Sequence, residues 1–265
     1  MSKQLLINAS ITDFAPLFGT LDYVFKGLKQ TGINGVELVI GMKSRWSIKK
    51  LRQLSEKYAL PIASIHQPIW SGLDLSFDEQ FVDLAKELDA KVVVFHPLSG
   101  IPFDHPHMQR YLQKLSLLQE KKGITVCLEN LPTKYNIKLV NYFLPPDKST
   151  TDILKLFSAV KQYGLKATLD IDHLRIPAPH KESWFMENLH LIGNIHLSSY
   201  TKNQEHLPLY MGDFKGKEFV EALKKHNYKG NLTFEIYYPR LTNLFSYNFE
   251  AIKKSVDFLS RGERT

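Results

Sequence analysis

The sequence predicts an α/β protein built as a single (β/α)8, or TIM, barrel over residues 1–265. Eight short apolar runs alternate with eight amphipathic stretches of helical period. Strand–helix units with right-handed crossovers close naturally into such a barrel. The expected helix-to-strand connections are short, whereas those after the strands are long, as in barrels that keep an active site on one face.

Each expected strand is a mainly apolar run, because a parallel strand covered on both faces has an almost continuous hydrophobic sequence. The main alternative is a doubly wound open sheet, which usually carries a glycine-rich phosphate loop after its first strand. The corresponding segment here, ITDFAPLFGT, contains no GxGxxG. The expected strands are 5–10, 35–40, 61–67, 91–97, 124–130, 167–173, 194–199 and 231–237.

The stretches between these runs place apolar residues at i, i+3, i+4 and i+7, which predicts helices with one buried face. Ser76 and either Ser149 or Thr150 are the expected N-caps of two of them. Four helices are followed by a glycine, which a left-handed cap favours: Gly32, Gly123, Gly164 and Gly193. The expected helices are 21–30, 48–58, 78–88, 108–121, 151–163, 181–191, 216–226 and 249–259.

Composition narrows the class of protein. With 43% hydrophobic residues the chain can bury a sizeable core, and its net charge of +7 is compatible with anions near the surface. The single cysteine, Cys127, excludes an intramolecular disulfide and a cysteine-based zinc cluster, and we expect it to be a small core residue. Because no run of about 18 apolar residues occurs, we expect a cytoplasmic protein with no membrane partner.

Acidic and imidazole side chains recur where the expected strands end, on the face with the long loops. Any one of them alone would more often be an ordinary hydrogen-bonding residue. Together at one mouth they would repel one another or titrate unless a cation lay among them, and such ligands suit Mn²⁺, Zn²⁺, Fe²⁺ or Co²⁺. The residues are Glu37, His66, His96, Glu129, Asp170, His173, His196 and Glu235.

Short motifs along almost the whole chain occur in a consistent order: GVEL, SIHQP, VVFHP, LEN, LDIDH, IHLSS, EHLPL and GNLTFEI. In this order and spacing the chain resembles the xylose isomerase-like barrel superfamily. That superfamily contains sugar-phosphate isomerases and epimerases as well as abasic-site nucleases of the endonuclease IV type. The resemblance therefore implies one fold and two candidate activities.

For the isomerase and epimerase branch, the resemblance implies a metal site of Glu129, Asp170, His196 and Glu235. Glu129 and Glu235 would also be the catalytic acid and base that move a proton beside a carbonyl of a small sugar or sugar phosphate. The cofactor would be a divalent metal, Mn²⁺ or Zn²⁺, with Co²⁺, Fe²⁺ or Mg²⁺ as alternatives.

For the nuclease branch, His66 and His96 match the ligands of a second metal. His206 resembles a ligand of a third metal, but Gln204 stands where that site has an aspartate. Nucleic acid is a partner only under this alternative.

A barrel that binds a ligand without catalysis is a third possible interpretation.

The remaining candidates are assigned to substrate binding or a further metal: His173, His206, Glu37 and Lys202. Asp172 is expected to be a loop or supporting acid, and Glu37 has the alternative of a lysine or arginine partner inside the barrel. We interpret the aromatic and lysine-rich loop 131–149 as a lid over a small substrate. A loop that stacks on DNA bases is the alternative.

Overall fold

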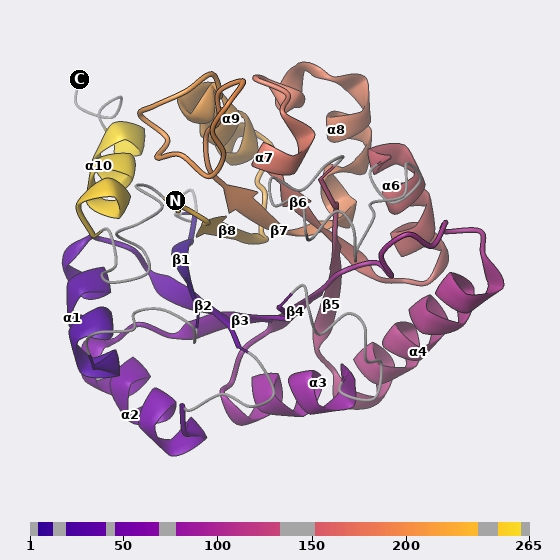
Figure 1. Ribbon diagram of the computed structural model, residues 1–265, viewed down its shortest axis with the longest axis horizontal. Coiled ribbons are helices and arrows are strands. Elements are labelled where there is room, and N and C mark those ends of the chain that lie inside the picture. The colour runs from indigo at the N-terminus through magenta and orange to yellow at the C-terminus, as the bar shows by residue number, and fades with distance from the viewer. Residues whose placement is uncertain are drawn as a thin grey trace.

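Eight parallel strands form a closed barrel in the order of the sequence, as the alternation of apolar runs and helical periods predicted. The computed structural model describes residues 5–12, 20–40, 46–68, 78–132, 152–237 and 249–260. Figure 1 looks into the barrel, with the strands at the centre and the helices in a ring around them. The barrel closes where β1 pairs with β8, with Ile7 opposite Leu232. The strands are β1 (Ile7–Thr12), β2 (Gly35–Val39), β3 (Ile62–His66), β4 (Val92–Phe95), β5 (Thr125–Glu129), β6 (Lys166–Asp170), β7 (Ile192–Leu197) and β8 (Asn231–Phe234).

The helices pack their apolar faces on the outside of the barrel, where large side chains such as Phe25, Phe81 and Phe219 are fully buried. None of the helices in the described ranges has both the length and the apolar character needed to cross a bilayer. The α-helices are α1 (Leu21–Gln30), α2 (Ile48–Tyr58), α3 (Asp78–Glu87), α4 (Pro106–Lys122), α6 (Ile153–Gln162), α7 (Ile171–Leu174), α8 (Ser183–Asn188), α9 (Gly216–Lys225) and α10 (Phe249–Ser260). Two 3₁₀ turns, η3 (Pro179–Lys181) and η4 (Leu189–Leu191), flank α8.

The expected strand 167–173 is wrong at its end. The strand stops at Asp170, whose Oδ1 accepts a hydrogen bond from the backbone N–H of His173 at 2.9 Å. This contact makes Asp170 the N-cap of the short helix α7, because an aspartate side chain can satisfy a backbone donor in the first helical turn. His173 therefore lies on a helical turn and not on the strand.

The expected helix 181–191 is also wrong as one element, since it is divided between η3, α8 and η4. Glu182 has an extended backbone, with φ −78° and ψ 137°, which separates η3 from α8. Successive short turns still bury Phe185 and Leu191 on one side. The spacing of apolar residues in the sequence is therefore that of one helix, although the backbone is divided into three short turns.

Glycines behave in two different ways. Gly32, Gly123 and Gly164 have φ between 63° and 88°, in the left-handed region expected for helix caps. Gly193 is not a cap, because β7 starts at Ile192 and includes it. A Cβ at this position would lie 2.7 Å from Cys127 Sγ, so a close approach inside the barrel requires glycine.

Two expected N-cap positions, Ser76 and Ser149 or Thr150, lie outside the described residues. The helix expected at 151–163 begins at Ile153, and its N-cap is Asp152. The Asp152 Oδ1 atom accepts hydrogen bonds from the backbone N–H groups of Leu154 and Lys155 at 2.9 and 3.3 Å.

The barrel interior changes character along its axis. Cys127 packs with Val92 and Val94 in a small apolar cluster and is fully buried, as expected of a core residue. Nearer the carboxyl ends of the strands the interior is polar, with Glu37, Asn194 and Thr233 all buried. A hydrogen-bonded polar layer therefore lies between the apolar core and the mouth.

Candidate metal centre at the barrel mouth

Four side chains meet where consecutive strands reach the mouth. Glu129 ends β5, Asp170 ends β6, His196 lies in β7, and Glu235 directly follows β8. One ligand atom from each lies within 4.8 Å of the ligand atoms of the other three. None of the four side chains is more than 8% exposed. Because parallel strands of a barrel end on one face, strand-end residues that are far apart in sequence become neighbours.

Asp170 is held in place through its backbone and one carboxylate oxygen. The side chain of Asn130 accepts a hydrogen bond from Asp170 N at 2.7 Å and donates one to Asp170 O at 3.1 Å. Asp170 Oδ1 caps α7, while the buried Oδ2 has no hydrogen-bond partner. Oδ2 is thus the atom that Asp170 offers to the cluster.

Glu235 is held in a similar way. The Tyr237 hydroxyl donates to Glu235 Oε1 at 2.7 Å, and Oε2 lies 3.0 Å from His196 Nδ1 without an aligned hydrogen bond. His206 packs edge-on against the Tyr237 ring, with centroids 4.7 Å apart, and its Nδ1 lies 3.1 Å from Glu235 O. Glu235 therefore has a protein contact on one oxygen and faces the cluster with the other.

His196 uses its two ring nitrogens in opposite directions. Nδ1 faces the cluster, 3.0 Å from Glu235 Oε2, 3.4 Å from Glu129 Oε1 and 3.6 Å from Asp170 Oδ2. Nε2 lies 3.0 Å from Glu37 Oε1, below the cluster. The charged partners of Glu37 in the described part of the chain are His196 and His66, so the expected alternative of a lysine or arginine partner is wrong there.

A second group shares Glu129 with the first. His66 Nε2 and His96 Nε2 lie 2.9 and 3.2 Å from Glu129 Oε2, whereas His196 Nδ1 lies nearer Oε1. The ligand atoms of His66, His96 and Glu129 lie within 4.8 Å of one another. The Glu129 carboxylate therefore lies between a group with four ligands and a group with three.

Histidine protons balance the charge of the carboxylates. Burial alone would raise the pKa of Glu129, but the charges of His196 and His66 hold that pKa well below its usual value. Burial likewise opposes ionisation of His173, yet Asp170 and Glu129 raise its pKa to about 9. Ionised carboxylates among imidazolium groups can exchange those protons for a cation, because metal binding to such ligands releases protons.

The donor set fits a divalent metal ion. Buried polar atoms nearly always have hydrogen-bond partners, whereas three atoms that face one another here have none: Asp170 Oδ2, His196 Nδ1 and Glu235 Oε2. Glu129 Oε2, which faces His66 and His96, has none either. Three carboxylates and one imidazole are ligands that Mn²⁺ and Zn²⁺ accept. Glu129, Asp170, His196 and Glu235 could hold one ion, and His66 and His96 could contribute to another.

The other candidate residues lie around this cluster. The His173 Nδ1 is 2.8 Å from Asn130 O, and the His173 ring is 5.9 Å from that of His206. Asp172, which we expected to have a supporting role, is buried and accepts a hydrogen bond from His206 N at 2.7 Å. Lys202 is exposed in the loop after β7, where its carbonyl lies 3.5 Å from Arg175 Nη1. Most of the loop expected to form a lid, residues 133–149, lies outside the described residues.

Sequence reasoning missed the polar residues that hold the ligands, although a simple signal marks them. Tyr237 and Asn194 lie two residues from Glu235 and His196, on the same side of an extended chain. Asn130 directly follows Glu129, and Ser64 lies two residues before His66. Polar residues next to a candidate ligand or two positions from it are therefore worth considering as supports of the site.

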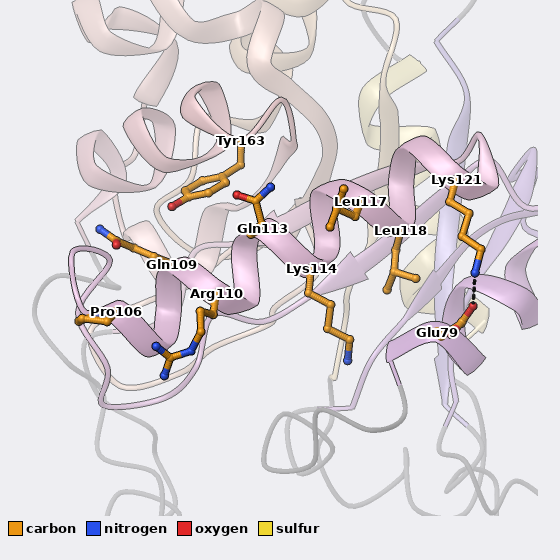
Figure 2. Close-up of a pocket in the computed structure, with 10 residues that line it drawn as sticks. All are labelled: Glu79, Pro106, Gln109, Arg110, Gln113, Lys114, Leu117, Leu118, Lys121 and Tyr163. Atoms are coloured by element: carbon orange, nitrogen blue, oxygen red, sulfur yellow. Dashed lines mark hydrogen bonds and ion pairs between the residues drawn. The ribbon is translucent and has the colours of Figure 1, made fainter.

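A groove of about 810 Å³ lies elsewhere, along the outer surface of α4 (Figure 2). It combines the aliphatic Leu117 and Leu118 with basic side chains such as Arg110. Among its described lining residues, the acidic Glu79 is paired with Lys121 at 3.3 Å. This groove has no grouping of carboxylates and imidazoles comparable to that at the mouth.

Curated proteins similar to this chain are uncharacterised. One from Methanocaldococcus jannaschii is 24% identical over 206 residues, covering 74% of this chain and 68% of the relative. One from Mycobacterium tuberculosis is 26% identical over 141 residues, covering 49% of this chain and 48% of the relative. The chain thus spans about half the length of the mycobacterial relative.

Solved structures with the same architecture include enzymes of two kinds. A 3-keto-D-glucoside 4-epimerase from E. coli matches with a TM-score of 0.70 and 17% identity, over 97% of this chain and 100% of that one. A D-allulose 3-epimerase from Methylomonas sp., in complex with D-allulose, matches with a TM-score of 0.69 and 16% identity, over 98% and 97%. An AP endonuclease of family 2 from Brucella melitensis matches with a TM-score of 0.69 and 14% identity, over 96% and 99%. At these identities the likeness concerns the fold.

The family assignment comes from the sequence itself. The family model described as xylose isomerase-like TIM barrel matches residues 25–261, which is most of the chain. The closed eight-strand barrel agrees with that description. The chain therefore belongs to the xylose isomerase-like TIM barrel family.

Proposed function

We propose that this protein is a divalent-metal-dependent isomerase or epimerase that moves a proton next to the carbonyl of a small sugar or sugar phosphate. The observation that carries this proposal is the convergence of four ligand atoms within 4.8 Å at the barrel mouth. Three of the four ligands, Asp170, His196 and Glu235, are held through one polar atom and direct the other toward the cluster.

In this proposal the two glutamates transfer the proton. A divalent cation in the site would polarise the substrate carbonyl and so acidify the neighbouring C–H group. Glu129 and Glu235 come from different strands, which allows one carboxylate to remove a proton and the other to return one. His196 and Asp170 would hold the cation, and His173, which is 18% exposed, would contact the substrate.

Similar structures support the choice of substrate class. They include epimerases of a 3-keto-glucoside and of D-allulose, the latter with D-allulose bound. Both names describe inversion at a carbon of a small carbohydrate. A free ketose, a keto-glycoside or a sugar phosphate is therefore the substrate range to test first.

The test measures proton transfer directly. The Mn²⁺-loaded protein is incubated with ketoses, keto-glycosides and ketose phosphates in D₂O, and NMR follows deuterium entering the carbon beside the carbonyl. We expect one substrate class to exchange. Glu129→Gln and Glu235→Gln should each reduce the rate by roughly 10²- to 10⁴-fold, the usual contribution of a general acid or base.

Glu187→Gln is the matched control, because Glu187 is an exposed glutamate of α8. Metal content is measured for every variant, so that loss of the cation is distinguished from loss of proton transfer. Full exchange by both active-site variants would refute the assigned proton-transfer roles.

An abasic-site endonuclease is the second candidate, and the group of His66, His96 and Glu129 is the observation that favours it. Against a third metal, Gln204 stands where a carboxylate would be needed. His206 Nδ1 also lies against the Glu235 carbonyl, so that nitrogen has a protein contact.

Two measurements separate the candidates. About one tightly bound ion per chain in elemental mass spectrometry, together with deuterium exchange, supports the isomerase. Two or three zinc ions per chain, with incision of a duplex that carries one abasic site, would support the endonuclease instead.

A further inference from the structure

Glu37 lies beneath the four candidate ligands and is fully buried. It belongs to β2, whereas the ligands come from β5 to β8. The pairing of β2 with β3 shifts between Val36 and Glu37, so that Glu37 lies opposite Ser64. This shift brings the Ser64 hydroxyl to 2.6 Å from Glu37 Oε2.

The two oxygens of Glu37 face different partners. Oε2 accepts hydrogen bonds from Ser64 Oγ and from Asn194 Nδ2, the latter at 3.1 Å. Oε1 lies 3.0 Å from His196 Nε2, without an aligned hydrogen bond, and 3.7 Å from His66 Nδ1. The carboxylate is therefore anchored on one side and directed at the imidazole on the other.

We propose that Glu37 is a positioning residue that keeps the proton of His196 on Nε2, so that Nδ1 presents its lone pair to the cation. This inference rests on the metal site of the proposed function. A metal-bound histidine commonly donates its other N–H to a carboxylate, which sets the tautomer and increases the basicity of the ligand.

Asn194 must be weighed as a competing partner, because its Nδ2 also lies 3.1 Å from His196 Nε2. A hydrogen bond from Nδ2 to Nε2 would require the opposite tautomer. The same Nδ2 donates to Glu37 Oε2, and Asn194 Oδ1 accepts from Thr233 Oγ1 at 3.2 Å. An ionised carboxylate 3.0 Å from Nε2 can only accept, so two lone pairs would face each other unless Nε2 carried the proton.

A glutamine at position 37 could not replace this carboxylate. Two donors, from Ser64 and Asn194, converge on Glu37 Oε2, and a protonated His196 Nε2 would be a third at Oε1, while a side-chain amide has a single acceptor oxygen. If the amide oxygen faced Ser64 and Asn194, its NH₂ group would face His196 and favour a proton on Nδ1. If the amide oxygen faced His196 instead, the NH₂ group would point at the donor groups of Ser64 and Asn194, and neither could donate a hydrogen bond to it.

The first experiment is calorimetric titration of the metal-free protein with Mn²⁺, for the wild type, Glu37→Gln and Asp78→Asn. We expect Glu37→Gln to bind Mn²⁺ about 10- to 100-fold more weakly, as is typical when such an outer partner is removed. Asp78→Asn is the matched control: Asp78 is also a fully buried carboxylate, but it belongs to α3 and lies 2.8 Å from Lys114 Nζ. Its affinity should equal that of the wild type.

The outcomes separate this inference from the proposed function. Equal Mn²⁺ affinity in the wild type and in folded Glu37→Gln would overturn the role of Glu37 and leave the metal site intact. A wild-type protein that binds no divalent ion would overturn both.

A second measurement needs no variant of Glu37. Histidine labelled with ¹⁵N in the Zn²⁺-loaded protein reports by NMR which ring nitrogen carries a proton, with the His196 signal identified by its loss in His196→Asn. We expect a protonated Nε2 and a metal-bound Nδ1. A protonated Nδ1 would refute the inference even if Glu37→Gln did not fold.

Discussion

Single side chains at the mouth engage one polar atom with the protein and leave the other for the cluster. Asp170 does so through the cap of α7, His196 through Glu37, and Glu235 through Tyr237. Ligands held in this way lose little freedom when an ion binds. The contacts of the supporting residues are thus as relevant to function as the ligands themselves.

Tyr237 provides a test at the scale of one residue. In Tyr237→Phe, Glu235 loses a hydrogen bond of 2.7 Å to a charged oxygen, an interaction worth about 1.5–3 kcal/mol. We expect turnover of the identified substrate to fall by roughly 10- to 100-fold if the whole of this energy acts in the transition state. Steady-state kinetics measure the change, and elemental analysis should show unchanged metal content.

Tyr228→Phe is the control for that variant. Tyr228 is also a buried tyrosine, but it lies near the start of β8, where its hydroxyl is 3.4 Å from Asn231 O. Its removal should leave kcat unchanged. Wild-type kcat in Tyr237→Phe would show that the hydroxyl does not position Glu235.

At the scale of elements, the approach of β7 to β5 depends on Gly193. A Cβ there would lie 2.7 Å from Cys127 Sγ and 3.1 Å from Lys166 Cβ. Cys127 cannot move aside easily, because it packs with Val92 and Val94. The glycine thus allows three neighbouring strands to meet inside the barrel.

We therefore expect Gly193→Ala to lower the free energy of unfolding by about 1–3 kcal/mol, the usual cost of overpacking a core. The cost should be smaller in a Cys127→Ala background, where the sulfur atom is absent. Urea unfolding of the two single variants and the double variant measures this coupling. Strictly additive free energies would contradict the proposed clash.

At the scale of the whole molecule, the candidate ligands lie on, or directly after, four consecutive strands, which form one half of the barrel. They come from β5, β6, β7 and β8, and the supporting Glu37 comes from β2 on the other side of the barrel closure between β8 and β1 (Figure 1). An ion bound to all four ligands would link strands that separate on unfolding. Metal binding should therefore stabilise the entire fold.

Mn²⁺ at 100 times its dissociation constant should add about 2.7 kcal/mol to the free energy of unfolding. For a chain of this size that corresponds to a rise of Tm by roughly 5–10 °C. Differential scanning calorimetry with Mn²⁺ and after chelation measures the change. Asp170→Ala should abolish it, and an equal rise of Tm in that variant would place the ion elsewhere.

The periodicity of the sequence was sufficient for the barrel and for the residues gathered at its mouth. Apolar runs and helical periods report which side chains are buried, and parallel strands in a barrel must end on one face. The strand ends therefore marked eight candidate residues before their distances were known, and the family resemblance selected Glu129, Asp170, His196 and Glu235 among them. The breaks at Asp170 and Glu182 could not, because a cap or an extended residue interrupts a helix without changing the apolar period.

The atoms that each residue presents depend on contacts between strands. Register shifts at Val36/Glu37 and at Ala167/Thr168 set which residues face one another across the barrel, and strand sequences carry no local sign of them. The partner of Glu37, the free nitrogen of His196 and the close approach at Gly193 all follow from that register. The alternation of side chains along a strand shows which of them point into the barrel. Only the packing of the strands against one another determines what each of these side chains contacts.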